Sequence, residues 1–98
     1  MTVTLGILAL LEAQPGKGRE LAEFLKKARE LAVAEEGTAS WYAFKISDTT
    51  YGVFDTSETD EARQTHLGGG IPVALGQVAA DLLASDPHIR PVDIVAVE

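Results

Sequence analysis

The stretch ASWYAFKISDTTYGVFDT, Ala39 to Thr56, decides the fold. It contains two segments rich in aromatic and β-branched residues, Ala39–Ile46 and Thr50–Thr56, joined by the polar residues Ser47-Asp48-Thr49. Residues of these types favour strands, and a short polar linker between two strands favours a tight connection. The stretch therefore predicts an antiparallel hairpin near the middle of the chain.

An apolar run and a long amphipathic segment precede this hairpin. Val3 to Leu11 is rich in Leu, Ile and Val, and the Pro15-Gly16 break after it indicates that a buried strand has ended. From Lys17 to Glu36, apolar residues recur at helical spacing while charged residues take the other face. Gly37 supplies the left-handed stop that commonly ends a helix. This half of the chain therefore predicts a strand followed by a helix.

Two helical segments and a last strand are expected after the hairpin. Ser57 and Asp60 resemble a capping pair that starts a short acidic helix running to about His66. The glycine run Gly68–Gly70 ends that helix, and an apolar helical stripe follows it. Ile89–Val97 is apolar at most positions and is predicted as the last strand.

The order of elements is strand, helix, strand, strand, broken helix, strand. This order matches the β-α-β-β-α-β arrangement of a ferredoxin-like sandwich, an α+β fold with helices on one face of a four-stranded antiparallel sheet. A chain of 98 residues has room for one core, so residues 1–98 are predicted to form a single domain.

The first strand carries apolar residues on both of its faces. Leu8 and Leu10 share one face, and the alternate residues share the other: Val3, Leu5, Ile7, Ala9 and Leu11. Because the helices cover only one face of the sheet, the second face needs another partner. Two-fold dimers are the commonest assemblies of soluble chains. We therefore expect a homodimer formed through the sheet face.

The composition restricts the possible partners. The formal net charge of −7 argues against nucleic acid and against an anionic membrane, since both require a basic surface. Without cysteine there is no disulfide, no thiolate metal site and no thiol nucleophile. The N-terminal apolar run is too short to span a bilayer and lacks the basic start of a signal peptide. We expect a cytoplasmic protein.

Sequence motifs for several kinds of chemistry are missing. There is no Walker loop, no dinucleotide fingerprint and no cluster of residues at metal-ligand spacing, so no metal site is expected. The run Gly68–Gly70 lacks the lysine and hydroxyl of a phosphate loop. It is interpreted as a flexible corner in preference to an anion site at the next helix N-terminus.

The remaining candidates are the hairpin aromatics and one histidine: Trp41, Tyr42, Phe44, Tyr51, Phe54 and His66. The aromatics form either hairpin core and dimer packing or a pocket wall. Strand alternation places Tyr42 and Phe44 on one face and Trp41 on the other, so only one set can line a cavity under the helices.

His66 also has two interpretations. It is either an exposed helix-end residue whose cation favours the negative end of the helix dipole, or a proton donor and acceptor beside a glycine-rich corner that a substrate can approach. His88, in an acidic turn, is assigned no role.

The segment YGVFDTSETDEARQTHLGGGIPVAL, Tyr51 to Leu75, resembles the third strand and helix region of the antibiotic biosynthesis monooxygenase family. These are small ferredoxin-like chains that dimerise through their sheets. The resemblance extends to the PGK opening of the long helix, the W-Y-x-F second strand and the I-x-P-V-D-I-V last strand. Members share a strand ending in an aromatic and an acidic residue, then a helix carrying a histidine. Phe54, Asp55 and His66 stand at those places.

The resemblance implies oxidation of a small, often polyketide-like phenol or hydroquinone to a quinone by O2, without metal, flavin or nicotinamide. It implies that His66 is the acid and base that handles the phenolic proton. Trp41, Tyr51 and Phe54 would hold the aromatic ring, and Tyr42 or Tyr51 would donate a hydrogen bond to a carbonyl.

Two other functions stay open. The haem-degrading branch of the superfamily uses an asparagine on the first strand and a tryptophan on the third; here the first strand has no asparagine and Phe54 takes the aromatic place. A haem-binding or haem-degrading protein is one alternative. A non-catalytic dimeric module that binds a small apolar ligand is the other.

Overall fold

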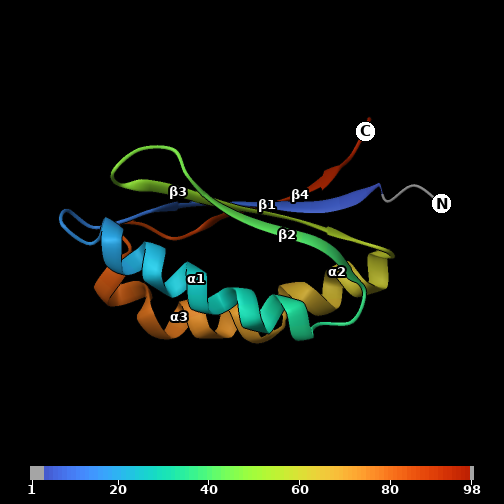
Figure 1. The fold of residues 1–98 in the computed structure, drawn as a ribbon, viewed down its shortest axis with the longest axis horizontal. Coiled ribbons are helices and arrows are strands. Elements are labelled where there is room, and N and C mark those ends of the chain that lie inside the picture. The colour runs from blue at the N-terminus through green and yellow to red at the C-terminus, as the bar shows by residue number, and fades with distance from the viewer. Residues whose placement is uncertain (1–3, 98) are drawn as a thin grey trace.

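The computed structural model describes residues 4–97 as one antiparallel sheet with helices on one of its faces (Figure 1). The elements in chain order are β1 (Leu5–Glu12), α1 (Gly18–Ala34), β2 (Thr38–Lys45), β3 (Thr50–Ser57), α2 (Asp60–Leu67), α3 (Gly70–Leu82) and β4 (His88–Asp93). The strands pair in the order β2-β3-β1-β4. The predicted ferredoxin-like α+β fold is therefore confirmed.

The core lies between the helices and the central strands. Leu11 of β1 is 1% exposed, and Leu21 and Leu25 of α1, which pack in the same cluster, are 0% and 4% exposed. Each such buried leucine contributes about 1.5–3 kcal/mol relative to an exposed one. Val3, which the predicted alternation also placed in this layer, lies outside the described residues.

The pairing of β2 with β3, which contains one bulge, decides which side chains of β2 face the helices. Thr38 pairs with Ser57, but Ser40 pairs with Thr56, so Ala39 is an extra residue in the ladder. Beyond this bulge, Trp41 lies opposite Asp55 of β3. Trp41, Ala43 and Lys45 consequently share the helix-side face, which the sequence alone left undecided.

Two predicted boundaries differ from the structure. Ser57 does not cap α2, because it is the last residue of β3; the Oγ1 atom of Thr59 accepts the hydrogen bond from the Ala62 amide at 3.0 Å instead. The last strand ends at Asp93 and does not continue to Val97. The paired register ends with Asp93 opposite Leu5, and one further backbone hydrogen bond follows, from the Ile94 N–H to the Thr4 carbonyl at 2.7 Å.

Candidate functional site

His66 lies in the last turn of α2 and is buried, with 6% of its surface exposed. Two carboxyl groups hold its ring from opposite sides. Nδ1 contacts Oε2 of Glu35, the residue that ends α1, and Nε2 lies 2.9 Å from Oδ2 of Asp55 on β3. His66 is thus a helix-end residue, as one interpretation held, but it is not an exposed one.

The two carboxyl groups stabilise the charged form of the ring. The pKa of His66 is raised from 6.5 to about 9, chiefly by the hydrogen bond to Asp55 and further by Glu35, while burial acts in the opposite direction. At neutral pH the ring therefore carries both protons, and each N–H donates to a carboxylate oxygen.

The glycine run makes room for one of these carboxylates. A Cβ atom at Gly69 would stand 2.7 Å from Oε1 of Glu35, closer than real side chains approach. Gly69 is also the N-cap of α3, and no side chain caps that helix. A carboxylate is favoured near a helix N-terminus. The Glu35 carboxylate is therefore the anion beside this helix N-terminus. The glycine run was expected to be a flexible corner, but it also provides the space that this carboxylate occupies.

An apolar cavity of about 50 Å³ lies beside the histidine, between the sheet and the helices. Asp55, His66 and Trp41 are its polar lining residues, and the others include Phe24, Ile71, Pro72 and Leu75. Within the described part of the chain, Oδ1 of Asp55 and Nε1 of Trp41 are buried and have no hydrogen-bond partner. A buried polar atom without a partner costs about 1–3 kcal/mol, so the fold sustains a penalty at this point.

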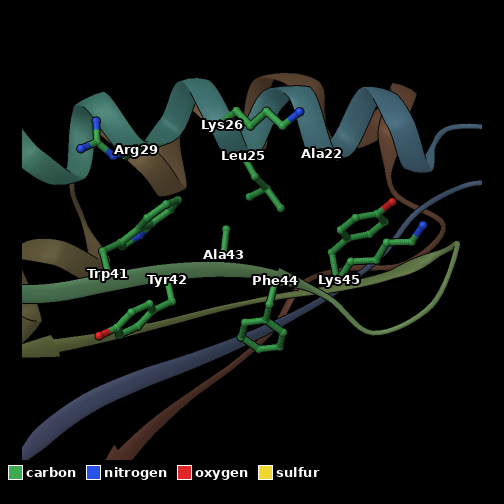
Figure 2. A pocket seen from close by; sticks show the side chains of 10 residues that line it. Ala22, Leu25, Lys26, Arg29, Trp41, Tyr42, Ala43, Phe44 and Lys45 are labelled. Carbon is green, nitrogen blue, oxygen red and sulfur yellow. The ribbon is translucent and has the colours of Figure 1, made fainter.

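A larger groove of about 430 Å³ lies between α1 and the edge strand β2 (Figure 2). Figure 2 shows Trp41, Ala43 and Leu25 pointing into it. Tyr51 also lines it, whereas His66 and Asp55 do not. Trp41 and Leu25 line both the groove and the cavity, so these two side chains form the wall between the spaces.

Not all of the predicted aromatic residues lie together. Trp41 and Tyr51 are on the helix side of the sheet. Tyr42 is paired with Phe54, and both belong to the alternate positions that face away from the helices. In Figure 2 the ring of Tyr42 points away from α1, although its strand borders the groove. Tyr42 and Phe54 are therefore not placed to hold a ring beside His66 in the same chain.

The arrangement can move a proton between solvent and the cavity. The Glu35 side chain is 21% exposed, His66 bridges it to Asp55, and Asp55, whose Oδ1 atom has no hydrogen-bond partner among the described residues, is one of the residues that line the cavity. His66 itself presents no unoccupied ring nitrogen. Ligation of a haem iron by this ring would require breaking one of its two carboxylate contacts. Within residues 4–97, no group of three or more His, Cys, Asp or Glu side chains is placed to hold a metal ion.

Sequence reasoning missed Glu35 altogether, and it identified Asp55 only through the family resemblance. A local signal existed for each. Glu35 and Glu36 end a helix, where the dipole disfavours acidic side chains. Asp55 interrupts the apolar helix-facing positions of a buried strand. Charges that break a local rule are often functional or paired.

Several solved structures are similar to this chain in both sequence and fold. A protein of unknown function from Nitrosomonas europaea is 44% identical, covers 98% of this chain and 93% of its own, and superposes with a TM-score of 0.95. A proposed antibiotic biosynthesis monooxygenase from Caulobacter crescentus is 25% identical over 98% of this chain and 92% of its own, with a TM-score of 0.77. This chain belongs to the antibiotic biosynthesis monooxygenase-like family.

Solved structures at lower identity share the fold. A second proposed antibiotic biosynthesis monooxygenase, also from Nitrosomonas europaea, is 12% identical over 97% of this chain and 94% of its own, with a TM-score of 0.81. No family model and no curated protein matches the sequence. Among the helices described between residues 4 and 97, none has the length and apolar character needed to cross a membrane.

Proposed function

We propose that this family member is a cofactor-independent monooxygenase that converts a small phenol to a quinone with O2. The observation that supports this most directly is the Glu35–His66–Asp55 chain, which runs from a partly exposed carboxylate to Asp55, a residue that lines the apolar cavity and has one carboxylate oxygen without a partner in the described part of the protein. Membership of the monooxygenase-like family agrees with it.

Asp55, and not His66, is the group that takes the phenolic proton. Its Oδ1 atom has no hydrogen-bond partner within the described chain, while Oδ2 accepts the Nε2–H of His66, and the residue lines the cavity. His66 is then a positioning residue: it holds Asp55 and connects it to Glu35 and solvent. A positioned acid or base of this kind contributes about 10²–10⁴-fold to a proton-transfer step.

The phenolate formed in this way is electron-rich enough to reduce O2 directly. One oxygen atom bonds to the ring carbon para to the hydroxyl and becomes the second quinone carbonyl. The other leaves as water when the O–O bond breaks, and it carries away the phenolic hydrogen and the hydrogen of that carbon. Phenol and O2 thus give quinone and water, and no outside reductant is needed.

The cavity beside His66 and the groove between α1 and β2 differ in volume and therefore suit different molecules. The cavity of about 50 Å³ holds a water-sized or dioxygen-sized molecule. The groove of about 430 Å³ falls in the range of small-molecule sites and holds an aromatic ring. Because Trp41 and Leu25 separate them, the proposal requires Trp41 to turn aside when the phenolic hydroxyl reaches Asp55.

Oxygen consumption by chelator-treated protein tests this function. Phenols, anthrols and hydroquinones are supplied with a no-protein blank, because several of them autoxidise. We expect uptake above the blank with quinone as product. Asp55→Asn keeps an acceptor for His66 but removes the base, and it should lower uptake by about 100-fold or more.

Asp81→Asn is the matched control, since it removes the same charge from an exposed position on α3. Equal uptake by the wild type and Asp55→Asn would refute the role of Asp55. Uptake that never exceeds the blank would favour the alternative of a non-catalytic module that binds a small ligand.

We further propose that the protein is a homodimer formed through the sheet face opposite the helices. Tyr42 and Phe44 on this face are 60% and 37% exposed, and Leu8, Leu10 and Phe54 are only half-buried. A contiguous apolar sheet face of this kind is typical of an interface. A second copy would cover it with the same residues, as two-fold symmetry requires.

A further inference from the structure

The charged residues that line the groove between α1 and β2 are all cationic. They are Lys26, Arg29 and Lys45, three of the eight Lys and Arg residues in a chain of net charge −7. No Asp or Glu is among the lining residues. Three cations along a hollow that no acidic residue of the described chain lines favour an anion there.

These cations are available to a ligand. Arg29 has no ion pair with any residue in the described part of the chain. Lys26 and Lys45 pair only with exposed carboxylates, at 3.1 Å each, on Glu23 and Asp48. Exposed pairs of this kind are worth little and exchange readily, so both ammonium groups can turn toward an anion in the groove.

The rest of the groove favours a flat apolar ring. Figure 2 shows the indole of Trp41 reaching from β2 toward α1, with Arg29 beyond it and the side chain of Leu25 beside it. Trp41 is only half-buried, so one part of its surface remains open to a ligand. Aromatic rings prefer to stack on or pack edge-on against such a surface.

We propose that this groove binds a planar aromatic carboxylate, with its ring against Trp41 and its carboxylate at Arg29 and Lys26. Guanidinium groups recognise carboxylates through paired N–H donors, which makes Arg29 the specificity-determining residue. If the protein is the monooxygenase proposed above, such a carboxylate is its substrate class, and the inference rests on that function in this respect only. Binding in the groove does not require that the ligand be oxidised.

Trp41 is the only tryptophan in the chain, so its indole N–H gives a single resonance in a ¹H–¹⁵N spectrum. The wild-type protein is titrated with 2-naphthoate and with the neutral 2-naphthylmethanol, which has the same ring. We expect both to move the Trp41 resonance and the naphthoate to bind about three- to tenfold more tightly. Arg29→Gln should remove that difference.

Lys27→Gln is the matched control, because Lys27 lies on the same helix but lines a separate surface hollow with Arg19 and Asp81. It should leave both affinities unchanged. Equal affinities for the two ligands in the wild type, or equal losses in Lys27→Gln and Arg29→Gln, would overturn the proposal. The titration follows binding alone, so its outcome is separate from that of the oxygen-uptake assay: tighter binding of naphthoate that depends on Arg29 would support the ligand class even if no phenol is oxidised.

Discussion

The raised pKa of His66 predicts that the protein loses stability between neutral and alkaline pH. The unfolded chain binds the histidine proton with a pKa of 6.5, whereas the folded protein binds it with a pKa of about 9. A proton that the folded protein binds more tightly than the unfolded chain stabilises the folded protein. This contribution is fully present below pH 6.5 and is lost as the pH rises through 9. At about 1.36 kcal/mol per pH unit, the total is roughly 3 kcal/mol.

Roughly 3 kcal/mol is a large share of the stability of such a domain, which is about 5–15 kcal/mol in all. Urea denaturation at several pH values from 6 to 9.5, followed by far-UV circular dichroism, measures it. With a urea m value of about 1–1.5 kcal/mol per molar, the midpoint should fall by about 2 M over this range. The chain concentration must be the same at every pH, because association with a second copy would add its own stability.

His66→Gln isolates the contribution of the ring. This variant should be less stable than the wild type at pH 6.5 and should lose the decline between pH 6.5 and 9. His88→Gln removes the other histidine, which is exposed, and should keep the decline. A wild-type unfolding free energy that stays level from pH 6.5 to 9 would refute the reasoning.

Three further changes test other parts of the structure. Thr59→Ala removes the N-cap of α2 and should cost about 1 kcal/mol of unfolding free energy in urea denaturation, and no loss would contradict the capping role. Gly69→Ala should push Glu35 away from His66 and lower the pKa of the ring, measured by NMR titration of its C–H resonances; an unchanged pKa would show that the corner tolerates a Cβ. Phe54→Lys places a charge on the proposed dimer face and should give a monomer in light scattering, which a persisting dimer would contradict.

Most of the fold could be predicted from local patterns. Hydrophobic periodicity located the long helix and the hairpin, because 3.6-residue and two-residue repeats reflect which side chains meet the core. The capping residue could not be predicted in the same way. Ser57 and Thr59 both have side chains that can cap a helix, and the pairing of β3 with β1 is what keeps Ser57 in the strand.

The candidate site was less predictable, since it is assembled from distant parts of the chain. Glu35 is 31 residues from His66 in sequence, and their contact depends on how α1 and α2 pack against the sheet. The histidine could be singled out from its position before the glycine run. That it would be enclosed by two carboxyl groups could be found only from the tertiary structure.

The bulge at Ala39 has a consequence for how this protein can evolve. Residues at alternate positions of β2 lie on different faces of the sheet: Trp41 faces the groove, and Tyr42 faces away from it. Loss of Ala39 itself would only restore a regular ladder, because Thr38 and Ser40 already pair with adjacent residues of β3. Loss of a residue after Tyr42 would instead shift Trp41 and Tyr42 by one position and turn each to the opposite face. Such a deletion would change the groove wall and the outer sheet face together, whereas point substitutions can change each of them independently.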